Sequence, residues 1–422
     1  MTSKAAENTA PSPNDETTKL FASWLASNGP VALRLRQKLL PVEADESGRG
    51  VIFPPTYADI GYNIDTLADG TRVATIDTVG SQANRLEPIF KSTGKDPEDN
   101  ELNALASLVP QVEIILHRAG GKKGNKKQEG EDGHIEKRSL LDLAHRSADA
   151  VVLASPTLAP EIAKAFEALR NKGNAAPLAA IAPTSLVFGV WDSRGTGEKR
   201  PRLVRSIIRA WNVEVLHSAA QFNSVWKALS EEQQKELAAE EKQKGKLELS
   251  AVGLKDAPAT FRKTDKIPQF ADGAPNPEAR VLGGVLAKGA IERDVTINLV
   301  ALRGIRGKDA DETKEVQRYL LGLAVVAATA DLELFLREGC LLRYANDDAW
   351  TEVPRRGDPT GVSLPKHEQL VAYAMVAALP FKAKWPDGLK KDDKPVLEHE
   401  FNLAEAKKLL AKKGDAPAEA QG

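Results

Sequence analysis

The sequence has little cysteine, almost no net charge and none of the short motifs that mark common catalytic sites. Cys340 is the single cysteine in 422 residues, which excludes an internal disulfide and a metal cluster held by several thiolates. The 58 basic and 59 acidic side chains nearly cancel, so any basic surface must be local. GxxxxGK[ST], GxSxG, HExxH and CxxC do not occur, and Gly195-Thr-Gly197 lacks the third glycine of a dinucleotide loop.

The chain shows neither a secretory signal nor a membrane span. Residues 1–16 are small and polar without an apolar segment, and we expect a disordered tail there. The longest uncharged run, residues 173–191, is interrupted by Pro177 and Pro183. It predicts a loop that enters a buried strand at residues 186–192. We therefore expect a soluble, cytoplasmic protein that does not contact a membrane.

Strands and helices are interspersed along the chain, which favours α/β or α+β packing. Helical spacing of apolar residues predicts helices at residues 17–27, 158–170 and 316–336, and a charged helix at residues 230–246. Alternation of apolar and polar residues predicts strands at residues 31–36, 73–79, 111–117 and 291–303, the first with a cationic face.

One segment is strongly cationic. Residues 194–211 contain six basic side chains and one acid, Glu198, in a chain of almost no net charge. Segregated positive charge indicates binding of a polyanion, and arginine suits bidentate contact with phosphate. If the segment is extended, Arg202 and Arg205 lie on opposite faces, whereas a helix would bring them together with Arg209. A solvated charged edge without a ligand is the alternative interpretation.

A short polar helix is the second candidate for anion binding. Ser81 is expected to cap a helix that carries Gln82, Asn84 and Arg85 and ends before Pro88. Amide donors and a cation near the start of a helix favour an anion. Taken alone, the segment is explained more simply as a capped helix without a ligand.

Candidates for catalysis or metal binding are weak. The six histidines are scattered without a ligand-like pair, so we expect no metal site and no cofactor. His145 and Asp149 have the spacing of a base with its orienting acid, but such pairs are common on helices without catalysis. Cys340 lies in an apolar context and is expected to be a buried, inert thiol.

Several segments together resemble one family, the backbone subunit of type I CRISPR effector complexes, in the branch labelled I-G (formerly I-U). They occur in the expected order over residues 31–345. They are LRLRQKLLPVE (33–43), VIFPPTYA (51–58), YNID (62–65), IDTVGSQANRLEPIF (76–90), LLDLAHRSADAVV (140–152), PTSLVFGVWDSRGTGEKRPRLVRSIIRAWNVEVL (183–216), INLVALR (297–303) and YLLGLAVVAATADLELFLREGC (319–340).

The resemblance implies an α+β fold with a modified RNA-recognition-motif core of the ferredoxin-like type, called a RAMP palm, with large insertions and a thumb-like hairpin. It implies that the subunit binds CRISPR guide RNA and polymerises along it with further copies of itself. The assembled filament would present the guide for pairing with target DNA, in contact with the other effector-complex subunits. No catalysis is implied for this subunit.

The resemblance also implies which residues contact guide phosphates. The basic segment supplies Arg194, Lys199, Arg200, Arg202 and Arg205. The polar helix supplies Ser81, Gln82, Asn84 and Arg85, and the polar face of the first strand adds Arg34 and Arg36. The aromatic consensus of ordinary RNA-recognition motifs is missing, so stacking of bases on the sheet is not expected.

We predict one palm with several additions. The palm with its insertions spans residues 17–345, a C-terminal elaboration follows at residues 346–412, and the last residues, 413–422, form a second disordered tail. Within the palm, residues 118–138 are expected to be a flexible loop and residues 230–284 a helical and Pro/Gly-rich insertion. Either residues 45–70 or residues 242–284 form the thumb.

Two other functions remain open from the residues. A RAMP-type endoribonuclease would need a group such as His145 or Asp192 at a scissile phosphate. A structural protein would bind no nucleic acid at all.

Overall fold

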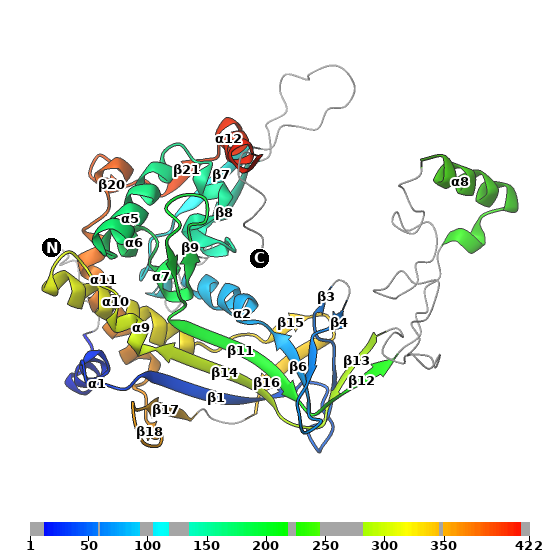
Figure 1. The fold of residues 1–422 in the computed structure, drawn as a ribbon, viewed down its shortest axis with the longest axis horizontal. Coiled ribbons are helices and arrows are strands. Elements are labelled where there is room, and N and C mark those ends of the chain that lie inside the picture. Colours follow the sequence, from blue (N-terminus) through cyan, green and yellow to red (C-terminus); the bar gives the residue numbers. More distant parts are fainter. Residues whose placement is uncertain are drawn as a thin grey trace, which may run out of the picture.

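The computed structural model describes residues 12–57, 60–92, 104–117, 135–217, 225–244, 282–345 and 349–414 of the chain. Among these residues, nine strands form one antiparallel sheet, and helices cover one of its faces (Figure 1). The predicted α+β fold class is therefore confirmed.

The central strands of the sheet come from distant parts of the sequence. The main path runs in the order β15 (Phe335–Arg337), β16 (Cys340–Tyr344), β1 (Ala32–Pro41), β14 (Ile291–Asn298), β11 (Val204–Trp211), β6 (Arg72–Asp77) and β5 (Ile64–Thr66). Strand β17 (Trp350–Val353) also pairs with β1, and β18 (Thr360–Val362) pairs with β17.

Alternation along the central strands separates a buried face from an open face. In β1, Leu33, Leu35 and Leu39 are buried, whereas Arg34 and Arg36 expose much of their side chains. Successive side chains of a strand point to opposite faces, so the two sets lie on opposite sides of the sheet. The predicted strand with one cationic face is confirmed.

Helices pack on the buried face. Helix α10 (Ala310–Thr329) lies against β14 and β11, and α11 (His367–Lys382) packs on α10, where the rings of Tyr319 and Phe381 stack 4.9 Å apart. Helices α2 (Val79–Leu86) and α7 (Pro183–Phe188) pack on β11. The other helices are α1 (Asp15–Leu25), α4 (Ala150–Leu153), α5 (Leu158–Lys172), α6 (Ala176–Ile181), α8 (Glu231–Lys244), α9 (Leu299–Arg303) and α12 (Leu403–Gly414).

The apolar interior has two parts. The larger part surrounds α10, whose residues from Tyr319 to Ala328 are all buried, as is typical of a helix at the centre of a core. The smaller part lies where β6, β13 (Leu282–Ala287) and β16 come together, and it contains Ile76, Val285 and Cys340. Burial raises the pKa of the Cys340 thiol to about 11, which agrees with the predicted inert thiol.

Smaller sheets extend from the main one. Strands β12 (Val213–His217) and β13 prolong β11 and β14, and β13 also pairs with β2 (Val51–Ile52). Residues 282–284, the described end of one candidate thumb segment, contact the other candidate segment, residues 45–70, where the backbone N–H of Gly284 donates to the hydroxyl of Tyr62 at 3.0 Å. The other small sheets are β3 (Thr56–Tyr57) with β4 (Gly61–Tyr62), β7 (Glu113–His117) with β8 (Ile135–Ser139) and β21 (Glu398–Glu400), β9 (Val190–Trp191) with β10 (Lys199–Arg200), and β19 (Lys390–Lys391) with β20 (Lys394–Pro395).

The predicted buried strand at residues 186–192 is wrong. Residues Pro183–Phe188 form α7, and only Val190–Trp191 form a strand. Every residue of α7 is buried, so the segment carries no alternation that would separate a helix from a strand. Pro183 stands at the start of the helix, where its missing N–H costs nothing.

Several predicted boundaries also differ from those in the structure. The predicted helix at residues 316–336 is α10, which ends at Thr329 and is followed by β15. The strand predicted at residues 291–303 ends at Asn298, whose side chain caps α9 by accepting a hydrogen bond from the N–H of Ala301. Residues 135–138, expected to belong to a flexible loop, form most of β8 and pair with β7, while residues 118–134 lie outside the described residues.

The predicted tails and insertion are only partly described. Asp15 and Glu16, placed in the first tail, belong to α1, which Asn14 caps. Residues 413–414, placed in the last tail, belong to α12. Residues 1–11, 245–281 and 415–422 lie outside the described residues, and the proposed division of the chain stays a prediction. Within the described ranges, no helix has both the length and the apolar character needed to cross a membrane.

Candidate nucleic-acid interface

The basic segment folds into a hairpin that forms one wall of a pocket. Strands β9 and β10 pair so that Trp191 lies opposite Lys199, with residues 192–198 as the connecting turn. The pocket has a volume of about 400 Å³. We call it the basic pocket, and it is lined by Ala144, His145, Arg146, Gly189, Val190, Trp191, Ser193, Arg194, Lys199, Arg200, Pro201 and Arg202. Its lining contains five permanent cations and no acid.

The hairpin turn is held by hydrogen bonds within the turn. The buried carboxylate of Asp192 accepts hydrogen bonds from the backbone N–H of Thr196 at 2.6 Å and from its hydroxyl at 2.8 Å. A Cβ on Gly195 would lie 2.5 Å from an Asp192 oxygen, so this position requires glycine. The Gly-Thr-Gly sequence is thus explained by the turn itself, and Asp192 is not available as a catalytic group.

Arg146 connects the basic pocket with α2. One guanidinium nitrogen of Arg146, Nη2, donates to Asn84 Oδ1 at 3.4 Å, and the other, Nη1, donates to the carbonyl oxygen of Gly189 at 3.3 Å. The two candidate phosphate-binding segments are therefore neighbours, although they lie far apart in the sequence. We call this pair of hydrogen bonds the Arg146 bridge.

A buried ion pair fixes Arg146 in this position. Its Nε lies 2.7 Å from Oε2 of Glu87, and its guanidinium carbon lies 5.5 Å from the centre of the Phe188 ring. The backbone of Arg146 has a φ of +53°, a left-handed conformation that costs energy for any residue other than glycine. Burial raises the pKa of Glu87 and lowers that of Arg146, since each charged form is desolvated.

Helix α2 contributes less to a free surface than the sequence suggested. Its cap is Thr78 and not Ser81, because the backbone N–H of Ser81 donates to Thr78 Oγ1 at 3.2 Å. Gln82 is fully buried, which removes it from any contact with a ligand. Asn84 is the exposed polar residue of the set.

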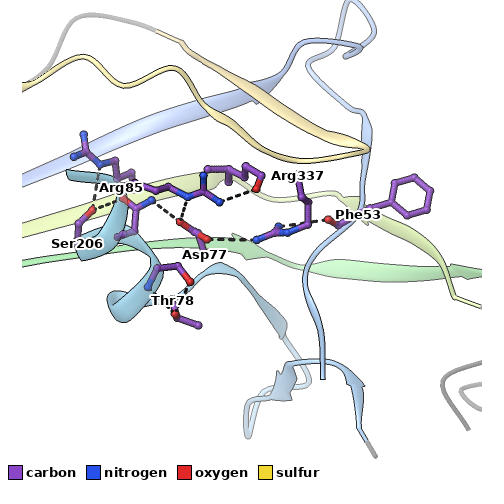
Figure 2. A network of polar contacts seen from close by, with 10 residues as sticks. Phe53, Asp77, Thr78, Arg85, Ser206 and Arg337 are labelled. Atoms are coloured by element: carbon purple, nitrogen blue, oxygen red, sulfur yellow. Dashed lines mark hydrogen bonds and ion pairs between the residues drawn. The ribbon is translucent and has the colours of Figure 1, made fainter. Parts of the chain in front are cut away.

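Gln82 and Arg85 belong to an internal polar network. Asp77, 1% exposed, accepts hydrogen bonds from Gln82 Nε2 at 2.7 Å and from Arg85 Nε at 3.0 Å. It also accepts one from Arg337 at 3.4 Å, and Figure 2 shows its carboxylate between the two arginines. Arg85 further donates to the carbonyl oxygen of Leu336 at 2.6 Å. Arg85 therefore neutralises a buried acid and links α2 to β15.

The same network crosses the sheet. Gln82 Oε1 accepts a hydrogen bond from the hydroxyl of Ser206 at 2.7 Å, and that hydroxyl accepts one from Nε of the buried Arg293 at 3.1 Å. Arg293 also donates to Gln37 at 3.0 Å. Side chains from α2, β11, β14 and β1 are thereby joined, which fixes the position of α2 on the sheet.

Arg205, Arg34 and Arg36 lie on the opposite face of the sheet. From Val204 onward the basic segment is a strand, as the extended interpretation predicted. Ser206 faces α2, and Arg205 points to the open face. Arg34 and Arg205 both lie opposite Thr296 of the intervening strand β14. The predicted single set of phosphate contacts is therefore divided between two faces of the molecule.

The open-face cations of β1 are partly neutralised. Arg34 and Arg36 lie 3.4 Å and 3.3 Å from Oδ1 of Asp294, and Arg36 lies 4.0 Å from Glu292. In the basic pocket, Arg200 is paired with Glu198 at 2.8 Å, while Arg194, Lys199 and Arg202 are exposed. The pocket is thus the stronger candidate for a polyanion.

Among the lining residues absent from the predicted phosphate contacts, three have an aromatic or basic side chain. Trp191 is 60% exposed and Lys199 Nζ lies 5.5 Å from its ring centre. His145 is exposed, and Arg146 is the bridging residue described above. Asp149 accepts hydrogen bonds from the backbone N–H groups of His145 and Val151, so it stabilises the local turn and helix α4. A tryptophan three residues before the cationic segment was the one signal in the sequence for an aromatic at this site.

Metal ligands are not grouped in the part of the chain that the structure describes. No three His, Cys, Asp or Glu side chains come together there in a way that could hold an ion. The features that characterise this interface are therefore its basic side chains and the ring of Trp191.

Fold and pocket together define an α+β protein with a main antiparallel sheet and a local cationic pocket. Residues 33–215 match the model of a family described as "CRISPR-associated protein GSU0053". This range includes α2 and every residue that lines the basic pocket. The resemblance to a CRISPR-associated family is thereby confirmed over these residues.

Among solved structures, several chains are similar to this one. One of them is a chain of a "CRISPR RNA-guided surveillance complex, pre-nicking", 12% identical in sequence, with a TM-score of 0.29 over 90% of this chain and 99% of that chain. No curated protein matches the sequence.

Proposed function

We propose that this chain is a non-catalytic subunit that binds CRISPR guide RNA through its sugar–phosphate backbone at the basic pocket. The observation that carries the proposal is the Arg146 bridge, which joins Asn84 to the pocket that contains Arg194, Lys199, Arg200 and Arg202. Arginine and lysine without grouped acids suit phosphate, and such contacts do not read base sequence. A guide that must remain free to pair with DNA needs this kind of contact.

The arrangement of the sheet supports a core of the RNA-recognition-motif type. The strands β16, β1, β14 and β11 are neighbours in this order. Helix α2 follows β1 in the sequence and packs on β11, and helix α10 stands between β14 and β16 in the sequence. Two interleaved strand–helix–strand units of this kind make a split βαβ sheet. We assign the RAMP palm to these four strands.

The wider role in the complex follows the family. We propose that further copies of this chain bind along the same guide, that other effector subunits complete a type I-G complex, and that the complex exposes the guide to target DNA. The cytoplasm is the expected location. Arg205, Arg34 and Arg36 are not part of the guide contact that we propose, because they lie on the other face of the sheet. Ser81, Gln82 and Arg85 serve the internal structure of α2.

The salt dependence of RNA binding tests the pocket. Arg202→Ala is expected to reduce the slope of log K against log salt by about 0.7, the share of one phosphate contact in a single strand. Arg205→Ala, three residues away on the opposite face, should leave the slope unchanged. Fluorescence anisotropy with a labelled single-stranded RNA measures both, and an unchanged slope for Arg202→Ala would remove this residue from the interface.

The cleavage alternative has one remaining candidate, His145, because it is exposed in the pocket while Asp192 is buried in the turn. We expect the full chain to leave labelled guide-length RNA intact, with and without Mg²⁺. Gel electrophoresis after prolonged incubation measures this. Fragments that disappear with His145→Ala would contradict the non-catalytic role and favour an endoribonuclease.

A further inference from the structure

Trp191 is unusual among the tryptophans of this chain because it is exposed. Its side chain is 60% exposed, whereas Trp24, Trp350 and Trp385 are almost completely buried. Leaving a large aromatic ring in water forgoes the free energy of its burial. A rigid exposed ring inside a cationic pocket is the arrangement by which proteins stack the bases of single-stranded nucleic acids.

The surroundings of Trp191 hold the ring in place. The residue pairs with Lys199 across the β9–β10 hairpin, and Lys199 Nζ lies 5.5 Å from the ring centre, within the range of a cation–π interaction. The turn that follows is held by Asp192 and Thr196, and Arg170 of α5 donates to the carbonyl oxygen of Thr196. Because the ring is already ordered, a ligand that stacks on it loses little additional entropy.

The pocket has the size and charge for one nucleotide. Its volume of about 400 Å³ lies within the usual range for small-ligand sites, roughly 300–1,000 Å³. Arg194 and Arg202 line the same pocket as Trp191. A base on the ring therefore leaves its phosphates within the cationic part of the pocket.

We propose that Trp191 is a stacking platform for one base of a single-stranded RNA, whose adjacent phosphates contact Arg194 and Arg202. This inference rests on the proposed function and adds a base contact to a site otherwise defined by phosphates. Stacking uses the face of a base, which every nucleotide has, so the contact is independent of sequence. It also moves base stacking from the sheet, where the aromatic consensus is missing, to the β9–β10 hairpin.

Two oligomers of equal length separate stacking from phosphate binding. One is oligouridylate, and the other is a ribose–phosphate chain without bases. Stacking of one base predicts that the full-length protein binds oligouridylate roughly 5- to 150-fold more tightly than the base-free chain. Trp191→Ala should abolish this difference and leave the affinity for the base-free chain unchanged, whereas Trp191→Phe should retain most of it.

Matched controls use the other groups of the molecule. Phe335→Ala removes an exposed ring on β15, outside the pocket, and should change neither affinity. Arg202→Ala should weaken binding of both oligomers. Quenching of tryptophan fluorescence by oligouridylate should be present in the wild type and lost in Trp191→Phe.

Four results would count against the inference, and they are distinguishable. Equal binding of both oligomers by the wild type would exclude stacking and leave phosphate binding intact. Equal weakening of both by Trp191→Ala would make the ring a structural support. A change in self-association alone would assign Trp191 to a protein contact. Binding of neither oligomer would overturn the proposed function itself.

Discussion

Replacing Arg146 by methionine is expected to lower the free energy of unfolding by about 3–5 kcal/mol, because the carboxylate of Glu87 is then buried without its cation. The two charged groups lie 2.7 Å apart, and neither side chain is more than 4% exposed. Methionine occupies similar space and leaves the strain at φ +53° in place, so the loss reports the charge. Urea denaturation measures it from the shift of the midpoint.

The double variant Arg146→Met/Glu87→Gln is the matched control. It removes both charges, keeps a polar side chain of similar size at position 87, and should recover most of the lost stability. If the double variant were as unstable as Arg146→Met alone, the loss would come from packing and the account of a buried ion pair would be wrong.

The stability of Arg146→Met should also depend on pH. Burial raises the pKa of Glu87, so the folded chain keeps a proton on this carboxyl group at pH values where the unfolded chain has released it. Stability from a raised carboxyl pKa is present at low pH and is lost as the pH rises. The single variant should therefore lose more stability at about pH 8 than at about pH 5, and the reverse order would contradict this mechanism.

The strands of the sheet could be predicted where one face is buried and the other is not. In β1, the alternation of Leu33 and Leu35 with Arg34 and Arg36 predicts both that the segment is a strand and which of its faces is buried. Helix α7 could not be predicted in this way, because it is buried on every side and its buried residues therefore show no periodicity. The end of α10 could not be located from the sequence, since apolar residues continue beyond the helix into β15.

The site could be predicted in its chemistry but not in its geometry. The cationic character of residues 194–202 is visible in the sequence. The extended interpretation placed Arg202 and Arg205 on opposite faces, and the structure separates them, although Arg202 precedes β11. The sequence gives no distance between Asn84 and Gly189, because that contact depends on how α2 and the β9–β10 hairpin pack around Arg146. The burial of Gln82 could not be predicted from the sequence either, since its partners Asp77 and Ser206 come from two different strands.

A chain with almost no net charge can still carry a local polyanion site. The acids close to the interface make contacts within the protein. Asp192 accepts hydrogen bonds that hold the hairpin turn, and Glu87 forms an ion pair with Arg146. Glu198 compensates one pocket residue, Arg200. The three exposed cations of the pocket, Arg194, Lys199 and Arg202, therefore carry the charge that a guide phosphate would meet.

Simultaneous replacement of Arg194, Lys199 and Arg202 by alanine is the second change with a large expected effect. Three lost phosphate contacts reduce the salt slope for single-stranded RNA by about 2, which at about 0.1 M salt corresponds to a loss of affinity of about 100-fold. The side chains are exposed on the hairpin and on the residues beside it, so the fold should be unaffected. Arg34, Arg36 and Arg205 replaced together by alanine provide the matched control, with the same number of charges removed from the opposite face.

The affinity of these two triple variants for guide-length RNA, measured side by side at one salt concentration, tests the central claim most directly. The account predicts that the pocket variant loses about 100-fold and that the open-face variant stays within a few-fold of the wild type. Undiminished binding by the pocket variant, with the large loss in the open-face variant, would place the RNA on the other side of the sheet and contradict the account.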